Sequence, residues 1–221
     1  SDEEIKILLD SSKSGQMYAF YVIALETGMR MGEILGLTWD CVDFKEGIID
    51  IQKTLCYIPN NGDAIYEFHQ TKTKAGKRKI PMTKKVKEVL LEQKKRKNQI
   101  IMRHPVAYPG MENLVFCSKT NRPVHESNIR AAIRYRVNKI NEENPQIEFK
   151  AFTPHCLRHT FATKAIDKGM RPKTLQKILG HNSLQMTMDL YTHVTEEKAG
   201  DDIERIVSKR NNAIDTGVNV V

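Results

Sequence analysis

Apolar residues recur with helical spacing over most of the chain, as in residues 2–13, where Ile5, Leu8 and Leu9 share one face. Glycines end several of these segments, since glycine adopts the left-handed conformation of a helix C-cap more readily than other residues; Gly28 is an example. Helices are therefore predicted over residues 2–13, 16–27, 31–37, 83–101, 124–140, 154–169, 172–179, 184–191 and 196–208.

Between residues 39 and 81 the pattern changes to that of strands. Residues 48–51 are rich in β-forming residues, residues 66–70 alternate, and a Pro-Asn-Asn-Gly-Asp turn lies between them at residues 59–63. The basic residues 71–79 then predict the tip of a hairpin. We expect an α+β fold, mostly helical, with a small antiparallel sheet of about three strands.

The composition is that of an ordinary soluble globular protein. The 221 residues are 40% hydrophobic and 28% charged, enough for one domain or two small ones. No apolar run is long enough to cross a bilayer and no signal-peptide pattern opens the chain, so we predict no membrane association; the abrupt start is consistent with a domain of a longer protein. The four cysteines form no C-x-x-C pair, which favours a reducing, cytoplasmic setting.

Positive charge adds a candidate partner. The net charge of +8 and the pI near 9.2 favour a polyanion, although charge alone leaves nucleic acid and no specific partner about equally open. The predicted helix over residues 83–101 carries basic residues on its outward face, densely enough to follow a phosphate backbone. These are Lys84, Lys85, Lys87, Lys94, Lys95, Arg96 and Lys97, and the helix over residues 124–140 adds Arg130, Arg134 and Arg136.

The candidate chemistry lies in residues 153–194. Thr153 supplies a hydroxyl cap and proline follows at the first helical position, so His155 and Arg158 project from the first turns of a helix. Unpaired N–H groups and the helix dipole favour an anion there, and the planar fork of arginine suits two phosphate oxygens. His181 follows another helix end, and Tyr191 closes the next helical pattern. The stretch predicts a phosphate-binding site that ends in a tyrosine nucleophile.

This stretch also allows other interpretations. His155 and His159 are four residues apart and His181 follows, as in some zinc sites, but Cys156 occupies the position of the glutamate that H-E-x-x-H chemistry requires, so no metal is predicted. The helices could instead form a DNA reader without catalysis, and Tyr191 could be a core aromatic.

Arg30 also allows two interpretations. It lies between two predicted helices beside Glu33, an arrangement typical of a structural ion pair. The residues alone leave open whether Arg30 is structural or functional.

Two motifs carry a resemblance to a known family. Residues 27–34 (Thr-Gly-Met-Arg-Met-Gly-Glu-Ile) resemble the first box of the tyrosine recombinase (phage integrase) family. The second box is resembled by residues 155–159 (His-Cys-Leu-Arg-His), Leu-Gly-His at 179–181, and Tyr191. The resemblance implies that residues 1–195 are the family's C-terminal catalytic domain, most like integrases of phages and conjugative transposons.

The resemblance also implies roles. Arg30 and Arg158 match the arginines that clamp the phosphate, and His155 and His181 match the two histidine positions. Tyr191 matches the nucleophile, which would form a covalent 3′-phosphotyrosine and release a 5′-hydroxyl. His155 would act as base or orient Tyr191, and His181 would donate a hydrogen bond to the phosphate. The two guanidinium groups would make a metal or other cofactor unnecessary.

The family's lysine, the general acid for the leaving oxygen, falls in the basic turn. Counting back from Pro81 selects Lys72, with Lys74 as the second choice. Further contacts to the DNA backbone are expected from Lys74, Lys77, Arg78, Arg130 and Arg134.

The resemblance implies recombination at attachment sites in double-stranded DNA, through a Holliday junction in a homo-tetramer, for integration and excision of a mobile element. An excisionase or a host DNA-bending protein would assist, in the bacterial cytoplasm at the nucleoid. Residues 196–221 would either dock on a neighbouring subunit or fray. A topoisomerase-like (type IB) DNA-relaxing enzyme and a non-catalytic DNA-binding regulator remain the alternatives.

Overall fold

The computed structural model describes residues 1–13, 15–60, 63–70 and 75–192. This part of the chain is mostly helical, and residues 185–192 form a final helical segment after the labelled helices. The helices are α1 (Asp2–Asp10), α2 (Gln16–Thr27), α3 (Met31–Leu35), α4 (Lys84–Arg103), α5 (Glu126–Glu143), α6 (Pro154–Asp167) and α7 (Pro172–Leu179), with a short 3-10 helix η1 (Trp39–Cys41).

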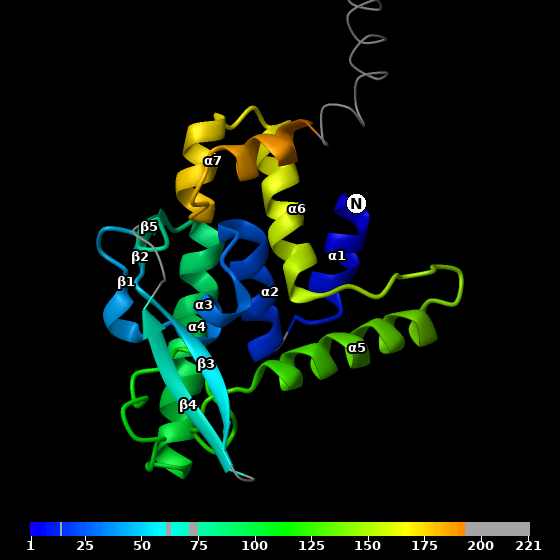
Figure 1. The fold of residues 1–221 in the computed structure, drawn as a ribbon. Coiled ribbons are helices and arrows are strands. Elements are labelled where there is room, and N and C mark those ends of the chain that lie inside the picture. The colour runs from blue at the N-terminus through cyan, green and yellow to red at the C-terminus, as the bar shows by residue number, and fades with distance from the viewer. Residues whose placement is uncertain (14, 61–62, 71–74, 193–221) are drawn as a thin grey trace, which may run out of the picture.

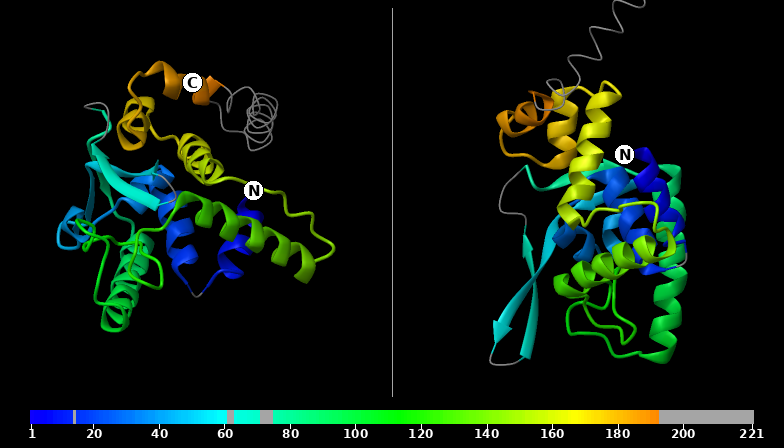
Figure 2. Two further views of the ribbon diagram at one scale, coloured as in Figure 1. Left: turned by 60° about the horizontal axis from the view of Figure 1, so that its bottom comes forward. Right: turned by 90° about the vertical axis from the view of Figure 1, so that its right-hand side faces the viewer.

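The expected three-stranded antiparallel sheet is present. It consists of β1 (Val42–Asp43), β2 (Ile48–Ile51) and β5 (Arg78–Pro81), in the order β1-β2-β5. A separate hairpin of β3 (Lys53–Asn60) and β4 (Asp63–Gln70) stands apart from the helices along much of its length in the side view of Figure 2.

The prediction of a hairpin tip at residues 71–79 was wrong. Among the described residues, β4 pairs with β3 and β5 pairs with β2, so β4 and β5 belong to two different sheets. The reason is that β3 and β4 pair with each other over their whole length, from Lys53 opposite Gln70 to Asn60 opposite Asp63.

The core lies around α2, which packs against α4 and α6. Phe20, Tyr21 and Ile23 of this helix are fully buried, as its apolar sequence predicts. A smaller cluster joins α6 and α7 with the segment 185–192, and Figure 1 shows these elements together at one end of the molecule. Within the described ranges, no helix has the length and apolarity needed to cross a bilayer.

One surface expectation for α4 was wrong. Lys97, predicted to face outward, is 2% exposed, and its Nζ donates to Asn121 Oδ1 at 2.6 Å. The loop after α4 folds back over the helix, since the Asn121 amide also donates to the carbonyl of His104 at 3.0 Å.

Candidate active site

Gly28 sets the entry of the chain into the site. It ends α2 in the left-handed conformation, with φ 63°, as the sequence predicted. A Cβ at this position would lie 2.5 Å from Cδ1 of Phe161, so only glycine allows the end of α2 to approach α6 this closely. The chain then turns directly into Arg30 and α3.

Arg30 is held by Glu33 three residues later. Its backbone N–H donates to Glu33 Oε2 at 2.8 Å, and its Nη1 donates to Glu33 Oε1 at 3.0 Å. Nη2 lies 3.4 Å from the carbonyl oxygen of Gly180. The arginine side chain nevertheless remains 44% exposed. The ion pair between Arg30 and Glu33 is therefore present, and it orients the Arg30 guanidinium group, which remains accessible to a ligand.

Arg78 was predicted to contact the DNA backbone, but its side chain is buried. Its side chain is 2% exposed, and two of its nitrogens donate to the two carboxylate oxygens of Glu33 at 2.9 and 2.8 Å. Burial raises the pKa of Glu33, but hydrogen bonds and charges from Arg78 and Arg30 outweigh it and lower the pKa overall. Arg78 compensates a buried carboxylate and is not free to meet a phosphate. The signal in the sequence was the alternation of β5, which places Arg78 on the same buried face as Ile80.

Arg158 reaches the site from the first turns of α6. It is 5% exposed and bridges two backbone carbonyls, with Nη1 2.6 Å from Gly28 O and Nη2 2.8 Å from Leu179 O. Burial, followed by the charge of Arg30, lowers its pKa to about 9. The guanidinium group thus links the end of α2, the start of α6 and the end of α7.

The C-terminal end of α7 gathers all three arginines. Its last carbonyls have no partner within the helix and carry partial negative charge. Three successive carbonyls accept from three guanidinium groups: Ile178 from Arg78 at 2.6 Å, Leu179 from Arg158 and Gly180 from Arg30. These contacts offset the repulsion between the three guanidinium groups and hold the groups together before any ligand binds.

His181 follows this cationic cluster directly. It is 8% exposed, and its Nδ1 lies 3.0 Å from the hydroxyl of Thr187. Burial and then the charges of Arg158, Arg30 and Arg78 lower its pKa to about 4. The imidazole is therefore neutral at neutral pH.

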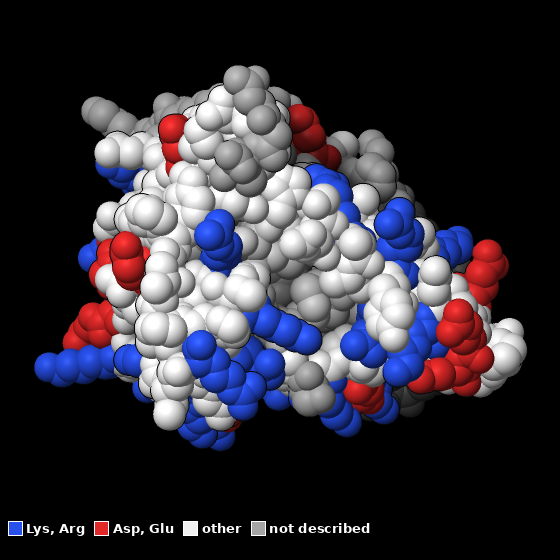
Figure 3. All heavy atoms as spheres, turned by 90° about the horizontal axis from the view of Figure 1, so that it is seen from below, with Lys and Arg blue, Asp and Glu red and all other residues white. Residues whose placement is uncertain are grey.

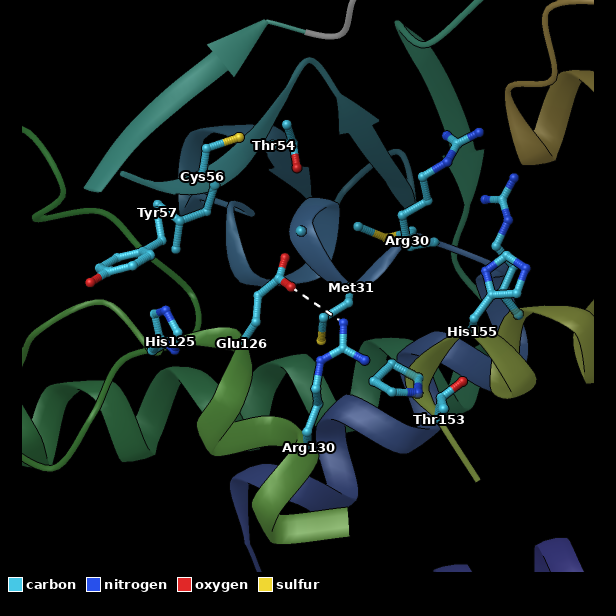
Figure 4. Close-up of a pocket in the computed structure, with 15 residues that line it drawn as sticks. Arg30, Met31, Thr54, Cys56, Tyr57, His125, Glu126, Arg130, Thr153 and His155 are labelled. Atoms are coloured by element: carbon cyan, nitrogen blue, oxygen red, sulfur yellow. Dashed lines mark ion pairs between the residues drawn. The ribbon is translucent and has the colours of Figure 1, made fainter. Parts of the chain in front are cut away.

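A cavity of about 700 Å³ opens beside these groups. Arg30 and His155 lie on one side of it, and β3 and the start of α5 lie on the other (Figure 4). Arg158 also lines the cavity. His155 is exposed at the start of α6, as predicted. The space-filling view in Figure 3 shows lysine and arginine side chains around a hollow on the face seen from below. The cavity has the charge and the openness that a polyanion requires.

Tyr191 lies apart from the cavity. Its hydroxyl donates to the carbonyl of Met170, between α6 and α7, and its ring packs on the smaller core cluster with Phe161 and Leu190. Burial raises its pKa. The structure brings Arg30, His155, Arg158 and His181 together but leaves the tyrosine hydroxyl directed elsewhere.

The other predicted site residues differ in their placement. Lys72 and Lys74 lie outside the described residues. Lys77 is exposed beside β5, and Arg134 is exposed on α5. Arg130 lines the cavity and forms an exposed ion pair with Glu126 at 3.5 Å.

These features define a class of protein. The small sheet and helical core, with arginines from the starts of α3 and α6 beside two histidines, match the fold of tyrosine recombinase catalytic domains. The family model described as "Phage integrase family" matches residues 1–198, and the chain belongs to this family.

Individual relatives agree with this assignment. The chain is 31% identical to the transposase from transposon Tn916 of Enterococcus faecalis, over 93% of this chain and 50% of that protein. It is 28% identical to a XerC-like tyrosine recombinase of Caldanaerobacter subterraneus subsp. tengcongensis, over 93% of this chain and 53% of that protein. The chain thus spans about half the length of these curated relatives.

A solved structure supports the same fold. The integrase of transposon Tn1549, in complex with transposon right end DNA, superposes with a TM-score of 0.75 at 30% identity. The match covers 93% of this chain and 64% of the integrase chain.

Proposed function

We propose that this chain is the catalytic domain of a site-specific DNA recombinase that cleaves and rejoins strands through a 3′-phosphotyrosine intermediate. The observation that carries the proposal is the convergence of Arg30, Arg158 and His155 on one open, cationic cavity. A phosphodiester gains negative charge on its nonbridging oxygens during displacement, and fixed guanidinium groups stabilise that charge.

Each group has a part in the reaction. The Tyr191 oxygen forms a bond to phosphorus while the bond to the 5′ oxygen breaks. His155 takes the tyrosine proton, Lys72 gives a proton to the leaving 5′ oxygen, and His181 donates a hydrogen bond to the phosphate. A 5′-hydroxyl from another strand then reverses these steps and rejoins the DNA. Two such exchanges pass through a Holliday junction, as integration and excision of a mobile element require.

Tyr191 must move for this chemistry. Its hydroxyl is bonded to the carbonyl of Met170, and burial raises its pKa, so in this position the oxygen is not activated and does not line the cavity of Arg30 and Arg158. Cleavage requires the helical segment 185–192 to shift, or the tyrosine to serve the cavity of an adjacent subunit. We therefore retain the homo-tetramer on DNA, with residues 196–221 linking subunits, as part of the proposal.

Double-stranded DNA at attachment sites is the proposed substrate. The related Tn1549 integrase is bound to transposon DNA, and the exposed Arg130, Arg134 and Lys77 lie where this chain could contact a phosphate backbone. Lys74 is a further proposed contact. An excisionase or a host DNA-bending protein would control direction, and the bacterial nucleoid would be the site of action.

A covalent trapping experiment tests the proposal. The 221-residue chain would be incubated with nicked duplexes of randomised sequence, in which cleavage releases a short fragment and traps the adduct. Wild-type protein should form a denaturation-resistant complex, with the DNA attached to Tyr191 by peptide mapping. Tyr191→Phe should bind DNA without forming the complex. An adduct that persists in this variant contradicts the assignment of the nucleophile.

The same assay separates the alternatives. DNA binding with no adduct from wild-type protein would favour the non-catalytic regulator. An adduct accompanied by relaxation of supercoiled DNA, but by no junction between two sites, would favour the topoisomerase-like enzyme.

A further inference from the structure

The hydroxyl of Thr187 has an unusual partner. Three other helical threonines, Thr27, Thr160 and Thr192, donate to the carbonyl four residues earlier in the chain. Thr187 instead has its side-chain hydrogen bond with Nδ1 of His181, at 3.0 Å. Thr187 is 0% exposed, so water cannot serve as a second partner.

The direction of this hydrogen bond follows from the available acceptors. In the described part of the structure, the ring nitrogen is the acceptor within reach of the buried Thr187 proton. If Nδ1 carried the proton and donated it, the hydroxyl hydrogen would be buried without an acceptor, which folded proteins avoid. The hydroxyl therefore donates and Nδ1 accepts.

The tautomer of His181 follows in turn. A neutral imidazole has one protonated nitrogen and one lone pair, so an accepting Nδ1 requires the hydrogen on Nε2. Burial of the ring, and then the charges of Arg158 of α6, Arg30 before α3 and Arg78 of β5, disfavour the imidazolium form, which would donate from both nitrogens.

We propose that Thr187 is a positioning residue, which holds His181 as a neutral ring with its hydrogen on Nε2 and thereby presents an N–H donor to the scissile phosphate. A phosphodiester oxygen only accepts hydrogen bonds, so the opposite tautomer would turn a lone pair toward it. The tautomer itself is a property of the folded chain, whereas its use in catalysis rests on the proposed function.

Nuclear magnetic resonance tests the tautomer without DNA. The 221-residue chain would be labelled with ¹⁵N-histidine, and the His181 signals assigned from their absence in His181→Gln. Wild type and Thr187→Ser, which keeps the hydroxyl, should both show a protonated Nε2 and an unprotonated Nδ1 at neutral pH. A protonated Nδ1 in wild type overturns the proposal.

Thr187→Val removes the hydroxyl at similar volume. Donation to the lone pair stabilises the neutral ring, so its loss should raise the pKa of His181 above the wild-type value of about 4 in a titration from about pH 8 to about pH 3. Thr187→Ser should titrate like wild type and also controls for folding. An unchanged titration in folded Thr187→Val overturns the proposal.

A cleavage assay tests the use of the donor. With saturating nicked DNA, Thr187→Val should lower the single-turnover rate of adduct formation about ten-fold while DNA affinity stays unchanged, and Thr187→Ser should restore the rate. Wild-type cleavage by Thr187→Val overturns the positioning role. If wild type forms no adduct but shows the expected tautomer, the proposed function fails and the assignment of the tautomer stands.

Discussion

Glu33 connects several residues of the site, although the sequence indicated only its pairing with Arg30. Among the described residues it is the only buried carboxylate, and it binds Arg30 and Arg78 at once. Arg78 also reaches the end of α7, so one acidic side chain ties α3, β5 and α7 together. A buried pair of this kind is sensitive to the loss of one partner, because the other charge is left uncompensated.

Glu33→Gln should therefore destabilise the fold strongly. Leaving Arg78 buried without a counter-charge should lower the free energy of unfolding by about 3–5 kcal/mol, measured by chemical denaturation. Glu92→Gln is the matched control, since its pair with Lys95 at 3.7 Å is exposed. That variant should lose less than about 1 kcal/mol. Equal losses in both variants would contradict the role given to Glu33.

His181 should make stability depend on pH in the mildly acidic range. Its pKa is about 4 in the folded chain, against an ordinary value of 6.5. Between these values the unfolded chain binds a proton that the folded chain does not, so stability falls as pH falls through this window. The loss should approach about 3 kcal/mol near its lower end. Denaturation at several pH values should show a shallower dependence in His181→Gln than in wild type.

Residues of the site differed in how far the sequence could place them. Arg30, His155, Arg158 and His181 stand in two compact motifs beside helix ends, and the structure gathers them. Arg78 was misassigned because a run of basic residues resembles a solvated turn, and its partner Glu33 lies 45 residues away. Contacts over such separations are set by the fold and leave no local pattern.

Helices and strands also differed in how far the sequence could place them. The ends of α2 and α7 match the prediction because left-handed glycines, Gly28 and Gly180, mark them locally. The predicted pairing of β4 with β5 was wrong, since strand pairing depends on residues distant in the sequence. The separate hairpin was indicated by the turn signal at residues 59–63 and by the alternation of residues 66–70, but neither identified the partner of β4.

Gly28 should tolerate a side chain less well than a glycine of similar conformation elsewhere. Gly28 and Gly169 have φ of 63° and 75°, but a Cβ at Gly169 meets no atom within 4 Å. Gly169→Ala should cost about 1 kcal/mol of stability, from backbone strain alone. Gly28→Ala adds the clash with Phe161 and should cost at least about 2 kcal/mol, measured by thermal and chemical unfolding. It should also slow cleavage, because Arg158 bonds to the carbonyl of Gly28. Similar losses at both positions would show that close packing at Gly28 contributes little.

At the scale of the whole molecule, the net charge of +8 favoured a polyanionic partner but did not locate the surface that would meet it. The structure divides the basic residues into groups with different tasks. Arg78 and Arg158 are buried and stabilise the junction of elements, whereas Arg130 and Arg134 are exposed on α5. The exposed pair is therefore the one of these two groups that can exchange counterions with the DNA backbone outside the active-site cavity.

The salt dependence of DNA affinity should report this exposed group. Each phosphate neutralised by a basic side chain contributes about −0.9 to the slope of log K against log salt concentration, so Arg130→Gln with Arg134→Gln should make the slope shallower by about 2. Lys139→Gln, on the same helix and paired with Glu143 at 3.5 Å, is the matched control and should leave the slope unchanged. Fluorescence anisotropy over a salt series measures all three proteins. Because neither substitution touches Arg30 or Arg158, the double variant should cleave at the wild-type rate once DNA is saturating. An unchanged slope would move the DNA-binding surface away from α5, whereas a lower rate at saturation would show that Arg130, which lines the cavity, also acts in the reaction.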